Sequence, residues 1–334
     1  MHDAPDMGAG WTPIIPVHYR VSAMDDFKPD FKHRSAYPDE EAAEQAVRTR
    51  DWARVRAIWD KGTTWRERGQ ALAGAGVDGS EVFLREVVER HPDDLLAATM
   101  LASRLITVGW SIRGDGWGSS VGQTQAEAFH DHLSQAEQLL ISVCARDPGF
   151  LPAWTHRLTT ARALSLGISE ARRRYDRAVK IEPHHMGAQQ SLLQQLCPKW
   201  GGDWDLAHGF ANQCAAAAPA GHPNAAIVVD AHMEHWMILK APEASEYFKD
   251  QAVHAQIQDA AQRSVFHPDF DRSRTWIYPF SMFALGFTMI GDWTSAKRCF
   301  LELGNYADEW GWQYMDGGAE KAFVTWRAKA LEQG

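Results

Sequence analysis

The sequence predicts an all-α protein built as an α-solenoid of stacked helical hairpins, and two recurring features carry this prediction. Three prolines, at 148, 183 and 219, stand thirty-five and thirty-six residues apart with helical patterns between them. An Asp-Trp pair recurs at 51–52, 203–204 and 292–293, each time between two helical stretches. A single hairpin cannot bury its apolar face alone, so neighbouring hairpins are expected to stack.

The central unit shows the side-chain pattern of a repeat most clearly. Ala171, Tyr175 and Ala178 fall at i, i+4 and i+7, which places them on one helix face. Small residues with one large ring on such a face are typical of tetratricopeptide repeats, in which two helices pack closely. Pro183 then ends the helix, because it lacks an N–H and its ring clashes with the preceding turn. The fold class that we expect is therefore tetratricopeptide-like.

The Asp of each Asp-Trp pair is a candidate N-cap, because its side-chain oxygen accepts the free N–H groups of a first helical turn. The last copy has the most regular surroundings. Phe283, Phe287 and Ile290 repeat at helical spacing before Asp292, and Ala296 follows four residues after it. We expect this stretch, 273–303, to be the final repeat.

Taken in order, the chain begins with a proline-rich stretch, 1–38, which we interpret as an extended N-terminal arm, followed by a helical-repeat domain over 39–334. Expected helices cover 40–50, 51–61, 80–90 (with Val82 facing inward), 94–108, 125–146, 224–239, 243–263 and a capping helix near 319–332. Five glycines between 109 and 122 predict a non-helical insertion over 109–124.

Composition excludes several functional classes. The chain has 334 residues, 45% of them hydrophobic, and a formal net charge of −9, so no basic groove for nucleic acid is expected. The short basic run Arg172–Arg174 is interpreted as a solvated helix face. Four widely spaced cysteines are expected to be free and buried. We find no signal peptide and no apolar run of about 18 residues, which predicts a cytoplasmic chain without a membrane span.

The glycine-rich stretch holds the first candidate site residues: Trp110, Arg113, Asp115 and Trp117. Glycines let a backbone approach a ligand closely, and an arginine fork suits a carboxylate or phosphate. The structural alternative is a connecting loop whose tryptophans anchor it on the helices. The spacing does not match a phosphate-binding loop.

Further candidates lie on the central repeats. Lys199 and Trp200 sit in a turn that places a cation near the glycine-rich stretch, and His232 and Glu234 lie on one helix. His130 and His185 complete the candidate ligand-binding set. His232 and His235 share a face, but two histidines do not make a metal site. We therefore expect no metal and no cofactor, and no catalytic residue is assigned.

Three segments together resemble an uncharacterised family of bacterial helical-repeat proteins. They are 113–117 (RGDGW), 199–202 (KWGG) and 231–234 (AHME), and the resemblance spans roughly residues 40–240. The resemblance implies a tetratricopeptide-like fold and no particular activity.

Two functional hypotheses follow. The first is an interaction protein that holds a peptide or protein partner in a concave groove. The alternative is a small-molecule-binding protein or enzyme, in which the glycine-rich stretch covers the central repeats, Arg113 and Lys199 hold a small anionic ligand, and His232 with Glu234 moves a proton. The two hypotheses separate by geometry, because the second requires these residues to converge.

Overall fold

The computed structural model describes residues 27–33, 36–114, 121–272 and 275–334, and within these ranges the protein is all-helical. One isolated bridge joins Asp30 to Tyr306. The elements are α1 (Pro38–Arg48), α2 (Trp52–Lys61), α3 (Trp65–Gly69), η1 (Gln70–Gly76), α4 (Ser80–Arg90), α5 (Leu95–Arg113), α6 (Gln123–Arg146), α7 (Leu151–Ala163), α8 (Ile168–Ile181), α9 (Met186–Leu196), η3 (Pro198–Trp200), α10 (Trp204–Ala217), η4 (Pro223–Ala226), α11 (Ile227–Trp236), α12 (Glu243–Tyr247), α13 (Gln251–Arg263), α14 (Ile277–Ile290), α15 (Trp293–Leu303), η5 (Trp312–Tyr314) and α16 (Gly318–Gln333).

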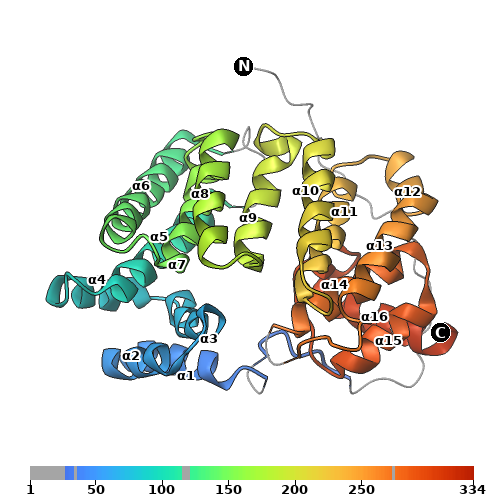
Figure 1. The fold of residues 1–334 in the computed structure, drawn as a ribbon, viewed down its shortest axis with the longest axis horizontal. Coiled ribbons are helices and arrows are strands. Elements are labelled where there is room, and N and C mark those ends of the chain that lie inside the picture. The colour runs from blue at the N-terminus through green and yellow to red at the C-terminus, as the bar shows by residue number, and fades with distance from the viewer. Residues whose placement is uncertain (1–26, 34–35, 115–120, 273–274) are drawn as a thin grey trace.

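The helices pack mostly against their neighbours in sequence, as in the pairs α5–α6, α7–α8, α9–α10 and α14–α15. Figure 1 shows that they follow an arch, with α1 and α2 at one end and α14 to α16 at the other. Two hydrophobic cores fill the arch, one within residues 46–231 and one formed mainly by residues 215–330.

The local signals that predicted the hairpins are confirmed. Asp51, Asp203 and Asp292 each begin a helix, and each accepts a hydrogen bond from a backbone N–H three residues later. Within α8, Ala171 and Ala178 are completely buried. The Tyr175 ring lies 5.4 Å from the ring of Phe210 on α10, so it fills the space between two helix pairs.

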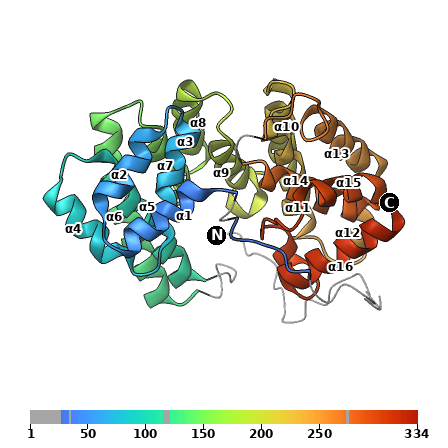
Figure 2. The same ribbon diagram turned by 90° about the horizontal axis from the view of Figure 1, so that it is seen from below.

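A segment before α1 joins the two ends of the arch. We call residues 27–33 and 36–37 the closing segment. The Phe27 ring stacks on Phe323 of α16 at 6.4 Å, and the Asp30 N–H donates to the Asn305 carbonyl at 2.6 Å. Tyr37 is buried in the second core, although α1 itself packs in the first part of the chain. In Figure 2 this segment crosses between the two halves of the arch.

The predicted insertion is shorter than the glycines indicated. Helix α5 continues through Gly109 and Trp110 to Arg113, and α6 begins at Gln123. Gly109 is a packing residue, because a Cβ there would lie 2.4 Å from Cδ2 of the buried Leu133 on α6. The helix ends at Gly114, whose φ of +70° suits glycine. Asp115 and Trp117 lie outside the described residues.

Two long helices predicted in the second half of the chain are each divided. Residues 224–239 form η4 and α11, which ends at Trp236. Residues 243–263 form α12 and α13, because Asp250 caps a new helix by accepting from the Ala252 N–H. The inward orientation expected of Val82 was also wrong. Its side chain is 61% exposed, because α4 packs through Phe83, Leu84 and Val87 instead.

The expectation that Arg172–Arg174 forms a solvated face is wrong for Arg174, which is only 2% exposed. Its guanidinium pairs with Glu137 of α6 at 2.9 Å and with Glu170 at 2.7 Å. Arg157 of α7 pairs with the same Glu137 at 2.9 Å. This buried network ties α6, α7 and α8 together, so its charges serve packing.

The four cysteines are free and buried, as predicted. The expectation that no long apolar run exists does not hold as stated. Helix α5 has 19 residues and a mean hydropathy of 1.5 over its most apolar window, which meets the length and composition criterion for a membrane span. It packs against α4, α6 and α7, and more than half of that window is buried, as in the core helix of a helical protein.

Candidate functional site

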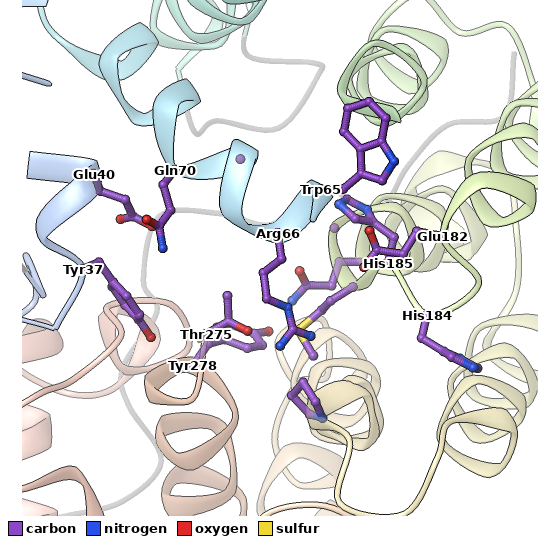
Figure 3. Close-up of a pocket in the computed structure, with 15 residues that line it drawn as sticks. Tyr37, Glu40, Trp65, Arg66, Gln70, Glu182, His184, His185, Thr275 and Tyr278 are labelled. Carbon is purple, nitrogen blue, oxygen red and sulfur yellow. The ribbon is translucent and has the colours of Figure 1, made fainter. Parts of the chain in front are cut away.

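Two adjoining clefts lie where the ends of the arch approach each other. The first, of about 430 Å³, we call the Arg162 cleft; it is lined by Arg162, Gln190, Ser191, Leu193, Gln194, Lys199, Asp230, Glu234, Tyr278, Trp310 and Tyr314. The second, of about 340 Å³, we call the Glu40 cleft; Figure 3 shows its lining. Gln190 and Tyr278 line both clefts, so the two are neighbours. Both have volumes typical of small-molecule sites.

Arg162, in the last turn of α7, is the most unusual charge in the first cleft. Its guanidinium donates to the Ser191 carbonyl at 3.2 Å and lies 6.0 Å from the Trp110 ring and 5.6 Å from the Trp200 ring. Among the described residues, no carboxylate comes within 4.0 Å of it. Burial lowers its pKa to about 10, opposed by the charge of Glu234. Arg162 is thus a cation at neutral pH without an ion-pair partner of its own.

A second cation in the same cleft is already paired. The Lys199 Nζ lies 2.7 Å from Glu234 Oε2, and the Gln194 amide donates to Glu234 Oε1. Lys199 belongs to the short turn η3, and Gly202 lets this turn fold tightly against the end of α9, because a Cβ there would lie 1.9 Å from the Leu196 carbonyl oxygen. Glu234 therefore neutralises the charge of Lys199, and the positive charge of Arg162 remains without a counter-ion in the cleft.

Asp230 lines the Arg162 cleft and is hydrogen-bonded to the two residues that line both clefts, Gln190 and Tyr278. Its carboxyl accepts a hydrogen bond from the Tyr278 hydroxyl and one from the Gln190 amide at 3.1 Å. Burial raises the pKa of Asp230 to about 7, against the lowering effect of these hydrogen bonds. Burial also raises the pKa of Tyr278 well above its usual value, so the phenol keeps its proton. The arrangement provides proton donors and an acceptor in one place.

Among the described residues, two carboxyls in the lining of the Glu40 cleft have no hydrogen bond or ion pair, those of Glu40 and Glu182. Burial, with a smaller effect of Glu44, raises the pKa of Glu40 to about 7. No hydrogen bond or ion pair to the Glu40 carboxyl occurs among the described residues, whereas its neighbour Asp39 pairs with Lys61 at 2.8 Å. Glu182 and His185 lie on the opposite side of this cleft, and Arg66 lies between them and Glu40 (Figure 3).

The structure brings together part of the set predicted from the sequence. Lys199 and Glu234 line the Arg162 cleft, and His185 lines the Glu40 cleft. Trp110 and Trp200 do not line these clefts, but their rings are 6.0 Å apart and hold Arg162.

The remaining predicted residues lie elsewhere. Arg113 stacks on Trp110 at 5.4 Å and donates to the Gly114 carbonyl at 3.0 Å. His130 is exposed on α6 near Ser134. The predicted proton-moving pair of His232 and Glu234 does not form, because positions two apart on a helix face different directions.

His232 belongs to a separate cluster on the other side of α11. Its Nδ1 lies 2.8 Å from the Tyr247 hydroxyl, which also lies 3.2 Å from His235 Nδ1 and 3.4 Å from His208 Nε2. Burial lowers the pKa of all three imidazoles, to about 3 for His232 and about 4 for His235. In the part of the chain that the structure describes, no group of three or more His, Cys, Asp or Glu side chains is arranged to hold a metal ion.

Several residues of the clefts were missed by sequence analysis: Arg162, Glu40, Asp230, Gln190 and Tyr278. One signal was available. Asp230 and Glu234 are one turn apart on a helix that is otherwise mostly apolar, so both carboxyls share a face. Arg162 gives no such signal, because its role depends on contacts with α5 and η3, far away in the sequence.

The fold and site define a protein that is all-helical in its described residues, with two adjoining clefts that carry charged and polar side chains. The sequence matches no protein-family model and no curated protein.

Proposed function

We propose that the protein binds a small anionic molecule, a carboxylate or a phosphate ester, in the Arg162 cleft. The single observation that carries this proposal is the unpaired guanidinium of Arg162. A partly buried charge without a counter-ion is costly, and an anionic ligand that pairs with it offsets that cost.

The surroundings of Arg162 suit such a ligand. The guanidinium lies beside the two indole rings and donates to the Ser191 carbonyl, so it is held in the cleft before the ligand arrives. Lys199, although paired with Glu234, adds an ammonium donor at the cleft, and the amides of Gln190 and Gln194 supply further polar groups. An arginine fork of this kind matches the two oxygens of a carboxylate or phosphate.

We further propose that the scaffold is a tetratricopeptide-like solenoid. The near-regular prolines, the three capping aspartates and the contact between Tyr175 and Phe210 support it. The second half departs from a regular stack, since α11 also contacts α13 and α14.

A peptide or protein partner in the arch is the second candidate function. It is supported by the repeat-like packing, since such scaffolds present extended inner surfaces. The closing segment spans the two ends of the arch, which favours a small ligand over a long peptide.

A thermal-shift screen of the purified protein tests the first candidate. The probes are inorganic phosphate, glycerol 3-phosphate, succinate and hexanoate, with sodium chloride of equal ionic strength as the control. A ligand at one hundred times its Kd adds about 2.7 kcal/mol to the unfolding free energy, so the melting temperature rises by several degrees. We expect at least one anion to stabilise the wild type, and to do so less in Lys199→Met. If no anion exceeds the chloride control, the proposal fails.

A further inference from the structure

We propose that the ligand carries two charged ends, an anionic group held by Arg162 and an ammonium group held by Glu40 in the adjoining cleft. This inference rests on the proposed function and assigns the second end of the ligand to a site of its own.

The first step is the isolation of the Glu40 carboxyl. Its neighbours along α1 have partners: Asp39 pairs with Lys61 at 2.8 Å and Glu44 with Arg48 at 3.0 Å. Glu40 has none among the described residues, although it is partly buried in the wall of a cleft. The positive end of the helix dipole favours acids in the first turn of α1. It does not offset the burial of Glu40, whose pKa stays raised to about 7.

The second step concerns the walls around this carboxyl. Tyr37, Trp65 and Tyr278 line the Glu40 cleft; Tyr37 lies on the Glu40 side, whereas Trp65 lies near Glu182 and His185 (Figure 3). Aromatic faces attract ammonium groups, and a carboxylate beside such a ring supplies the matching charge. In Figure 3 the Glu40 side chain lies near Gln70 and Tyr37, on one side of the cleft.

Arg66 is the cation that would oppose an ammonium group, and in Figure 3 its side chain lies between Glu40 and Glu182. Its guanidinium pairs with Asp271 at 3.4 Å. Its charge acts on the pKa values of Glu182 and His185 but is not among the influences on Glu40. The Glu40 end of the cleft therefore keeps its preference for a cation.

The third step is the connection between the two lone charges. Gln190 and Tyr278 line both clefts and both donate to Asp230, so a continuous polar wall runs from one cleft to the other. One cleft offers an unpaired guanidinium and the next an unpaired carboxyl. A molecule with a carboxylate or phosphate at one end and an amine at the other compensates both charges at once.

Isothermal titration calorimetry with matched probes tests this. The two-ended probes are 4-aminobutanoate, 6-aminohexanoate, 8-aminooctanoate and the aminoalkyl phosphates of the same lengths. The one-ended probes are the carboxylates and alkyl phosphates that lack the amine. Carboxylate and phosphate arms identify the anionic group, and the series of lengths measures the separation of the two ends.

At one chain length, we expect the two-ended probe to bind wild type roughly tenfold more tightly than its one-ended match. This advantage disappears in Glu40→Gln and persists in Glu41→Gln, a control that removes an exposed charge from the same helical turn. Arg162→Met weakens both kinds of probe. Circular dichroism verifies that each variant is folded.

Two outcomes overturn the inference, and they differ in what they leave standing. If one-ended and two-ended probes bind wild type equally at every length while Arg162→Met abolishes both, the anion site stands and the ammonium site is refuted. If no probe of either kind binds wild type, the proposed function fails together with the inference.

Discussion

At the scale of single residues, the clefts hold carboxyl groups in an environment that favours their protonated form. Burial raises the pKa of both Asp230 and Glu40 to about 7. Between about pH 4 and pH 7 the folded protein therefore holds protons that the unfolded chain has released. The unfolding free energy falls as the pH rises through this window, and the full cost of ionisation is present above pH 7.

The fall in unfolding free energy with rising pH leads to a prediction for Asp230→Asn. The amide cannot ionise and still accepts a hydrogen bond, so the variant gains stability relative to wild type as the pH rises from 5 to 8. Because one pKa unit corresponds to about 1.4 kcal/mol, the relative gain is on the order of 2–4 kcal/mol. Urea unfolding at the two pH values measures it. Asp259→Asn, on the exposed face of α13, is the control and should change little with pH. A gain that is equal at pH 5 and pH 8 would contradict the assignment.

Residue-scale prediction from the sequence reached only part of the site. Lys199 was predicted because a cation in a glycine-containing turn is visible in the sequence, and Glu234 was included as the expected partner of His232, a pair that does not form. Arg162 and Glu40 were not predicted, because a missing partner is a property of the folded surroundings. The prediction that Arg174 is solvated was wrong for the same reason, because nothing in its own helix shows that Glu137 lies opposite it.

At the scale of elements, helix starts were predictable and helix continuity was not. An aspartate cap or a proline acts within one turn, so the sequence carries the signal directly. The sequence predicts a helix break at Gly109, yet α5 continues through it, and Leu133 of α6 occupies the place that a Cβ would take. The division at α12–α13 coincides with the local Asp250 cap, and η4 packs against α10, α13 and α14.

The turn that carries Lys199 gives an element-scale prediction. Gly202→Ala places a methyl group against the Leu196 backbone, which cannot move aside as a side-chain tip can, so the turn must shift. We expect a loss of about 2 kcal/mol of unfolding free energy and weaker anion binding, because Lys199 moves with the turn. Gly209→Ala, within α10 and with open space around it, should raise stability by about 0.5–1 kcal/mol. Equal effects of the two substitutions in urea unfolding would refute this account of Gly202.

At the scale of the whole molecule, the helices pack mainly with their neighbours in sequence, and the closing segment connects the two ends of the arch. Neighbour packing was predictable from repeat spacing. The closure was not, because it depends on Tyr37 and Phe27 reaching a core formed mainly by residues 215–330.

Tyr37→Ala tests this closure. The ring is buried among residues of the second core, so its removal should cost about 3 kcal/mol and increase hydrogen exchange in both α1 and the start of α14. Tyr37→Phe keeps the ring and loses only a long 3.5 Å hydrogen bond from the Ile277 N–H, so it should stay close to wild type. If faster exchange after Tyr37→Ala were confined to α1, the closing segment would not join the two ends.

The central claim is that Arg162 binds an anionic ligand, and the Arg162→Met variant tests this claim most directly. Methionine retains apolar contact with Trp110 and Trp200 and removes the unpaired charge. We expect the melting temperature without ligand to stay the same or rise, while stabilisation by any anion that binds wild type disappears. Arg172→Met, an exposed arginine on α8, should leave both quantities unchanged. A fall in the ligand-free melting temperature of Arg162→Met, with anion stabilisation intact, would show that Arg162 serves the fold and would contradict the account.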